Sequence, residues 1–133
     1  MDGMFLERNQ YDQLWDGAWI TVQVLAFSFV LGLVLSLVFG VARLSEHKVV
    51  RGAALGFVEF ARGISSIVLL TIIAIAIPIL LEMEQASRIM LASIALGINM
   101  GGYGAEIVRG SIQAVPRGQT EASIALNLSP SQR

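Results

Sequence analysis

The segment AWITVQVLAFSFVLGLVLSLVFGVA, residues 18–42, decides the fold class of this chain. It contains no charged residue, and at about 25 residues it is long enough to cross a bilayer with some tilt. Its many Leu, Ile, Val and Phe side chains favour insertion, and polar side chains such as Thr21 and Gln23 reduce that preference without reversing it. The segment therefore predicts a transmembrane helix.

The composition of the whole chain agrees with a membrane protein. Of its 133 residues 55% are hydrophobic and 14% are charged, whereas soluble domains carry about 25% charged residues. The net charge of −1 gives no indication of nucleic-acid binding, and the absence of cysteine excludes disulfides and thiolate chemistry. The segment of residues 1–17 is acidic overall and lacks the basic region of a cleaved signal peptide.

Two further uncharged runs follow, at residues 64–81 and 89–105. The first is rich in isoleucine, which favours a strand in water, but its length in so apolar a chain favours a membrane helix. Pro78 near its end predicts a kink or a stop. We therefore predict an all-α integral membrane protein with three transmembrane helices in a region spanning residues 18–105.

The basic residues indicate an orientation. They concentrate between the first two runs and after the third, at Arg43, Lys48, Arg51, Arg62, Arg109, Arg117 and Arg133. The positive-inside rule places such segments in the cytoplasm. It predicts residues 1–17 outside, and the loop of residues 43–62 and the segment of residues 106–133 inside.

Small residues recur every fourth position inside two of the runs, at Gly32, Ser36 and Gly40 and again at Gly97 and Gly101. Small residues at this spacing allow helices to approach closely in lipid. Two interpretations stay open: ordinary packing between helices of this chain, or an interface with a second subunit.

Three polar residues near the runs also allow two interpretations each. The buried amide of Asn99 predicts a hydrogen bond to a neighbouring helix or a position on a translocation path. Glu59 and Arg62 share a helix face, so they predict an ion pair at the end of the second run, with the translocation path as the alternative.

The chain shows no signature of catalysis. It has no phosphate-binding loop of the Gly-x4-Gly-Lys-Ser/Thr kind and no nucleophile–base arrangement. His47 is a lone histidine in a charged loop, so no metal site is predicted. We expect no catalytic residue, no metal and no cofactor, and any energy from ATP must come through a partner chain.

The polar C-terminal stretch, YGAEIVRGSIQAVPRGQTEASIALNLSP at residues 103–130, is amphipathic. Its apolar residues follow helical spacing, and Pro116 and Gly118 predict the end of that helix. Thr120 is expected to cap a short second helix with Glu121 in its first turn. Asn127 is expected to adopt a left-handed turn, and Ser129 and Pro130 to begin another helix. The segment thus predicts a helix–turn–helix.

This stretch resembles the cytoplasmic coupling loop, called the EAA loop, of permease subunits of type I ABC importers for polar amino acids. The matching residues are Tyr103, Glu106, Arg109, Gly110, Pro116, Gly118, Gln119, Glu121, Ala122, Leu126 and Ser129. Further matches precede the second run, at Phe57, Val58, Glu59, Phe60, Arg62 and Gly63. Ile64 and Ser65 replace the usual Thr-Pro of the family, and the serine is similar to ectoine-type permeases. Ser123 and Asn127 are smaller departures from the loop.

The resemblance implies a function and a set of partners. The chain would be a multi-pass permease subunit of the bacterial cytoplasmic (inner) membrane, importing a polar amino acid or a related solute. Its partners would be an ABC ATPase subunit, a second permease subunit, a solute-binding protein and membrane lipids. The residues expected to contact the ATPase are Gly118, Gln119, Glu121, Ala122, Ser123, Leu126 and Asn127.

Two alternatives accompany this interpretation. The C-terminal helix could lie on the membrane surface, and the chain could be a small non-transporting membrane protein that binds a partner through this segment. The resemblance covers only the N-terminal part of a family member, so we expect the sequence to be a fragment with an incomplete coupling segment.

Overall fold

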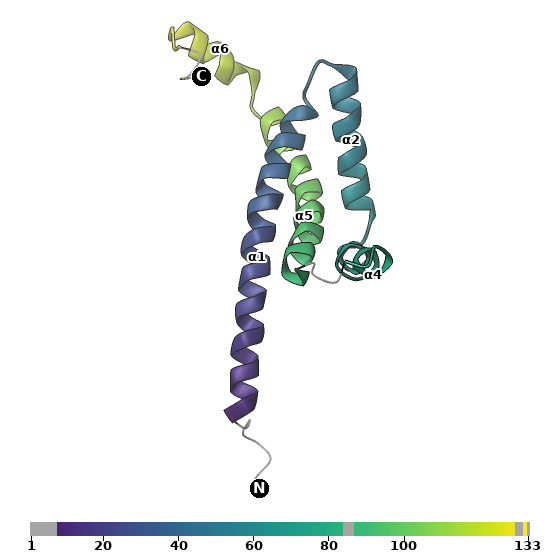
Figure 1. Cartoon of the computed structure of the whole chain (residues 1–133). Helices are drawn as coiled ribbons and strands as arrows, with labels where there is room; N and C mark the ends of the chain where they lie inside the picture. Colours follow the sequence, from purple (N-terminus) through teal and green to yellow (C-terminus); the bar gives the residue numbers. More distant parts are fainter. Residues whose placement is uncertain (1–7, 84–86, 130–131, 133) are drawn as a thin grey trace.

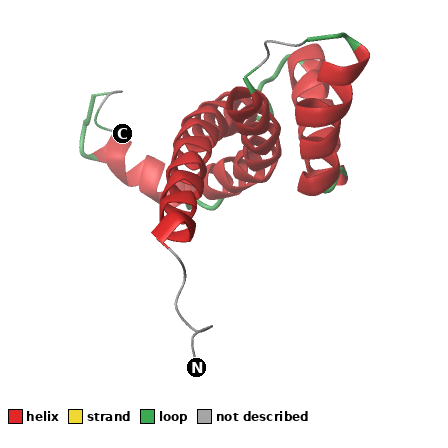
Figure 2. Ribbon diagram, turned by 60° about the horizontal axis from the view of Figure 1, so that its bottom comes forward, coloured by secondary structure: helices red, strands yellow, loops and turns green. Residues whose placement is uncertain are grey.

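The regular structure of the chain is entirely helical wherever it is described. The computed structural model describes residues 8–83, 87–129 and 132. The elements are α1 (Arg8–Ala42), α2 (Lys48–Gly63), α3 (Ser66–Thr71), the π-helix η1 (Ile72–Ala76), α4 (Ile77–Leu80), α5 (Arg88–Gln113) and α6 (Arg117–Ala125). Figure 2 shows helices and loops, with no strand in these residues. The predicted all-α fold is confirmed.

Two helices are long and apolar enough to cross a bilayer. They are Tyr11–Ala42 within α1 and Arg88–Gln113, which is α5. They contain the first and third predicted spans, residues 18–42 and 89–105. A third crossing results only if α2 and the bent segment after it, Ser66–Leu80, count as one span.

The segment predicted as a loop, residues 43–62, is mostly the helix α2. Its buried residues Ala54, Val58 and Ala61 recur at helical spacing, and α2 packs against α5. Figure 1 shows α2 running beside α5. The sequence analysis treated this segment as the connection between two spans and expected a helical face only at Glu59 and Arg62, so it overlooked the apolar stripe between the charges.

The second predicted span, residues 64–81, is not one straight helix. The direction of the chain turns by 97° between α2 and the segment Ser66–Leu80, which Figure 1 shows nearly end-on at the label α4. Pro78 lacks an N–H group and its ring crowds the carbonyl of Ala74, so the helix widens into η1 just before it. The predicted kink at the proline is therefore a π-helical turn.

The packing of α1 on α5 depends on small residues. Ser28, Gly32, Ser36 and Gly40 of α1 are all buried. A Cβ atom added to Gly101 of α5 would lie 2.7 Å from the Cβ atom of Leu35, and one added to Gly104 would lie 2.8 Å from the Cβ atom of Ser36. The two small-residue faces therefore meet each other within this chain, as ordinary packing predicts.

On its other side α5 packs against α2. A Cβ atom added to Gly102 would lie 2.6 Å from the Cβ atom of Ala61. Near the end of α1 the ring of Phe39 stacks on the ring of Phe57 of α2, with centroids 3.8 Å apart, and this contact joins the two helices. Helix α5 is thus the centre of a three-helix cluster.

Gly104→Val should destabilise the chain, because the new side chain has no room against Ser36. The expected loss in the free energy of unfolding is about 1–3 kcal/mol, the usual cost of overpacking. The measurement is an SDS titration in mixed micelles. Gly110→Val is the matched control, since Gly110 is in the same helix and has nothing within 4 Å of an added Cβ atom. Equal losses for both variants would contradict the close α1–α5 contact.

Candidate functional site

Asn99 joins α5 to the end of α2. Its side-chain amide donates hydrogen bonds to the carbonyl oxygens of Ala61, at 2.9 Å, and Ile64, at 3.4 Å. The last carbonyl groups of a helix have no partner within the helix, and in a bilayer no water replaces it. Asn99 therefore satisfies the backbone at the point where the chain turns.

The ion pair predicted between Glu59 and Arg62 is not formed. The guanidinium of Arg62 lies 5.6 Å from the centroid of the Tyr103 ring and 3.9 Å from the carboxylate of Glu106. Glu59 is exposed and forms no ion pair in the described part of the chain. Arg62 turns to α5 because α5 offers both an aromatic face and a carboxylate.

Glu106 holds together three segments that are distant in sequence. Its carboxylate accepts hydrogen bonds from Arg43, just after α1, and from Nε of Arg109 at 3.1 Å, and it attracts Arg62 of α2. Arg109 also donates to the side chain of Gln113 at 2.6 Å. The four charged side chains are between 15% and 39% exposed. We name this group, Arg43, Arg62, Glu106 and Arg109, the arginine cluster.

Sequence reasoning matched Glu106 to the family and missed its partners. One signal was present: Glu106 is the single acidic residue between positions 89 and 120. It also directly follows an uncharged run, as Arg43 does. Charges at such boundaries are candidates for pairing with one another.

The second helix of the C-terminal segment begins about one turn earlier than predicted. Helix α5 ends at Gln113, before Pro116, as expected. Helix α6 then starts at Arg117 with Pro116 as its N-cap residue, and the Pro116 carbonyl accepts the N–H of Gln119 at 3.0 Å. Thr120 is inside α6, so its prediction as the cap was wrong, and Glu121 is not in the first turn. The φ angle of Pro116, fixed near −63°, suits a helix start.

Asn127 ends α6 with the predicted left-handed conformation, at φ 57°. Its N–H group donates to the carbonyl of Ile124 at 2.9 Å, and the N–H group of Leu128 donates to the carbonyl of Ser123 at 3.1 Å. This is the Schellman pattern, which satisfies the last carbonyls of a helix. Asparagine serves here because it tolerates positive φ better than other side-chain-bearing residues.

The expected helix start at Ser129 and Pro130 is described only in part. The N–H group of Ser129 donates to Oε1 of Gln132 at 3.0 Å, as the first residue of a capping box does. Pro130 lies outside the described residues.

Helix α6 stands apart from the other helices. Figure 1 shows it leading away from the end of α5, and in the described part of the chain it packs against no other helix. The residues expected to contact a partner lie on or just after it. Gly118, Gln119, Glu121, Ala122, Leu126 and Asn127 are exposed, and Ser123 is half-buried. This surface includes apolar side chains, with Ile124 52% and Leu126 73% exposed.

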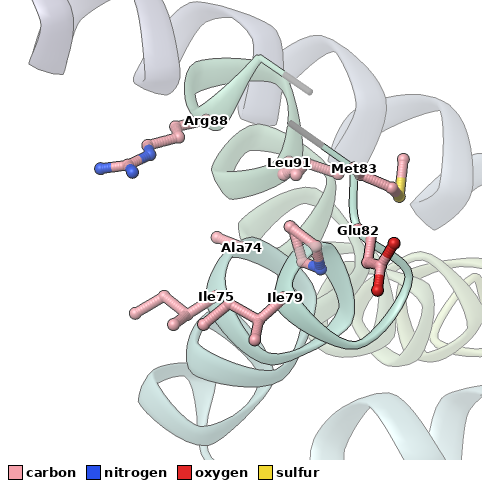
Figure 3. A pocket seen from close by; sticks show the side chains of 8 residues that line it. Ala74, Ile75, Ile79, Glu82, Met83, Arg88 and Leu91 are labelled. Carbon is pink, nitrogen blue, oxygen red and sulfur yellow. The ribbon is translucent and has the colours of Figure 1, made fainter. Parts of the chain in front are cut away.

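A half-open pocket of about 520 Å³ lies at the opposite end of the bundle. Its lining comes from η1, α4, the residues just after α4 and the start of α5, and is Ala74, Ile75, Pro78, Ile79, Glu82, Met83, Arg88 and Leu91. Figure 3 shows the charged groups of Glu82 and Arg88 pointing away from each other. No group of three or more His, Asp or Glu residues that could hold a metal ion occurs among the described residues.

Asn99→Leu should loosen the turn after α2, because the Ala61 and Ile64 carbonyls lose their donor. Interhelical hydrogen bonds in membranes contribute about 0.6 kcal/mol on average and about 1.7 at most. Spin labels at Gly52 of α2 and Leu80 of α4, both exposed, give by pulsed EPR the distance between these two helices, which changes with the angle of the turn. We expect the distance distribution to broaden in Asn99→Leu and to stay unchanged in Ser93→Ala, whose hydroxyl bonds only within α5. A distribution as narrow as that of the unmodified chain would show that Asn99 does not hold the turn.

Comparison with known sequences finds similarity over most of the chain. The family described as "Binding-protein-dependent transport system inner membrane component" matches residues 28–133. A probable amino-acid ABC transporter permease protein, y4tF of Sinorhizobium fredii, is 42% identical over 120 residues, which are 87% of this chain and 50% of that protein. The glutamine transport system permease protein GlnP of Escherichia coli is 33% identical over 114 residues, covering 86% of this chain and 52% of that one.

Comparison with solved structures agrees. The crystal structure of an amino acid ABC transporter with histidines is similar with a TM-score of 0.67 and 25% identity, over 96% of this chain and 61% of that chain. This chain therefore spans about half the length of the curated relatives it matches.

Proposed function

Since the chain belongs to the family of binding-protein-dependent transport system inner membrane components, we propose that it acts as a permease subunit of an ABC importer for a polar amino acid or a related solute. The relatives with 42% and 33% identity are amino-acid permease proteins by name. The observation that carries the proposal is α6, an exposed helix without a packing partner among the described helices, at the position of the family's coupling loop.

The proposed partner of α6 is an ABC ATPase. A short helix with exposed Ile124 and Leu126 suits a groove on another protein, which is a common recognition mode. Glu121 is exposed on the same helix and offers a charge to the rim of that groove. The ATPase supplies the energy of transport, and this chain itself catalyses no reaction.

The proposed route from the ATPase to the membrane is α5. The connection of residues 114–116 joins α6 to α5, and α5 carries both Glu106 and Asn99. A displacement of α6 therefore acts on the arginine cluster and on the turn after α2, through hydrogen bonds already described. A second permease subunit would complete the path, and a solute-binding protein would deliver the solute.

The proposed orientation places residues 1–17 outside and residues 106–133 in the cytoplasm. The excess of basic residues near the arginine cluster and α6 supports it. Single cysteines at Gln13, Lys48 and Gln119 test it with a membrane-impermeant thiol reagent on intact cells. We expect labelling at Gln13 alone. Labelling at Lys48 or Gln119 without labelling at Gln13 would reverse the topology.

Co-purification with the cognate ABC ATPase tests the function. The chain should retain the ATPase, and Glu121→Ala should weaken binding about tenfold if the carboxylate contributes about 1.4 kcal/mol. Glu46→Ala is the matched control, because Glu46 is an exposed acid in the connection between α1 and α2. Asn127→Val should also weaken binding by disturbing the end of α6, whereas Asn127→Gly should not. A chain that does not bind the ATPase would favour a non-transporting membrane protein.

A further inference from the structure

The arginine cluster has an unbalanced charge. Three guanidinium groups, from Arg43, Arg62 and Arg109, surround the single carboxylate of Glu106. Arginine keeps its proton at any physiological pH. The other acids on this side, Glu46 and Glu59, form no ion pair in the described part of the chain. The cluster therefore carries two positive charges in excess.

Several N–H groups of the three guanidinium groups donate no hydrogen bond within the described part of the chain. Glu106 accepts from Arg43 and Arg109, and the guanidinium of Arg62 is 3.9 Å from it, beyond hydrogen-bond distance. Each guanidinium has five N–H donors in a fixed fork. Arg62 is the most exposed of the three, at 39%, and its guanidinium lies over the ring of Tyr103 with no hydrogen bond to Glu106, so its N–H donors stay available to a ligand.

The position of the cluster along the chain fixes its depth in a bilayer. Arg43 and Glu106 directly follow the uncharged runs 18–42 and 89–105, and Arg62 is the last charged residue before the run 64–81. The runs 18–42 and 89–105 end, and the run 64–81 begins, close to one carboxylate, because the side chains of Arg43 and Arg62 both approach Glu106. The level of this carboxylate is where the hydrocarbon core ends and lipid phosphates begin.

Two tryptophans give an independent measure of that depth. Trp15 and Trp19, in the first half of α1, are 75% and 64% exposed, and tryptophan prefers the membrane–water interface. At about 1.5 Å per residue the stretch from Trp19 to Arg43 spans about 36 Å. The hydrocarbon core is about 30 Å thick and the bilayer with its headgroups about 40–45 Å. The cluster therefore lies at the headgroup level when the tryptophans lie at the opposite interface.

We propose that the arginine cluster binds the phosphate group of an anionic phospholipid, with Arg62 as its principal contact. Guanidinium groups bind phosphate oxygens through paired, charge-assisted hydrogen bonds. The single negative charge of the phosphodiester halves the excess charge, and the lipid adds a contact that joins α1, α2 and α5 from outside. This inference goes beyond the proposed transport function and stands whichever leaflet the cluster faces.

Lipid selectivity measured by EPR tests the proposal. The full chain is reconstituted in phosphatidylcholine bilayers with traces of spin-labelled phosphatidylglycerol or spin-labelled phosphatidylcholine, and the motionally restricted fraction of each is compared. The chain should prefer phosphatidylglycerol. Arg62→Gln should lower this preference about fivefold, since a basic residue near the surface contributes about 1 kcal/mol to the attraction of anionic lipid. Glu106 keeps its two other partners in this variant.

Matched controls separate the cluster from the general charge of the chain. Arg51→Gln removes the same charge from an exposed position of α2 and should leave the preference nearly unchanged. Glu106→Gln should raise the preference, whereas Glu46→Gln, which changes the charge equally, should not. Circular dichroism verifies that each variant keeps its helices.

Three outcomes would overturn the proposal. The first is no preference for phosphatidylglycerol in the unmodified chain, which would assign the excess charge to acidic groups of a protein partner. The second is an equal loss in Arg62→Gln and Arg51→Gln. The third is displacement of the labelled lipid by inorganic phosphate but not by chloride at equal ionic strength, which would identify a site for free phosphate.

Discussion

The close approach of α1 and α5 is the constraint on which the rest of the structure depends. Apolar surface gains nothing by leaving lipid, so helices in a membrane associate through tight packing of small residues. Gly101 and Gly104 provide that contact, and no side chain would fit in their place. Because α5 is held in this way, its Asn99 and Glu106 have fixed positions from which to bind the other segments.

The polar groups of the bundle are arranged around this contact. Asn99 supplies donors where α2 ends, and the carboxylate of Glu106 gathers guanidinium groups from α2 and from the end of α1. Both residues are on α5, seven positions apart, so two turns of one helix organise the turn in the chain and the charged boundary of the bundle. No buried side-chain polar atom lacks a hydrogen bond in the described residues.

The sequence was informative wherever the signal was local. The uncharged lengths of residues 18–42 and 89–105 predicted α1 and α5, and the tolerance of asparagine for positive φ predicted the turn at Asn127. The family resemblance, carried by the fixed spacing of residues 103–129, is confirmed by the match over residues 28–133. The contacts of Glu106 with Arg43 and Arg62 escaped prediction because they join positions far apart in the chain. The stripe of Ala54, Val58 and Ala61 was hidden among charges.

The connection between α5 and α6 is short and stiff. Residues 114–116 comprise one residue in helical conformation, Ala114, then Val115, then Pro116 with φ near −63°. Proline removes one of the few rotations available to so short a linker. Only three residues separate the two helices, so a displacement of α6 leaves little length in the connection to absorb it before α5 is affected. A longer or glycine-rich linker at residues 114–116 would let the two helices rotate independently.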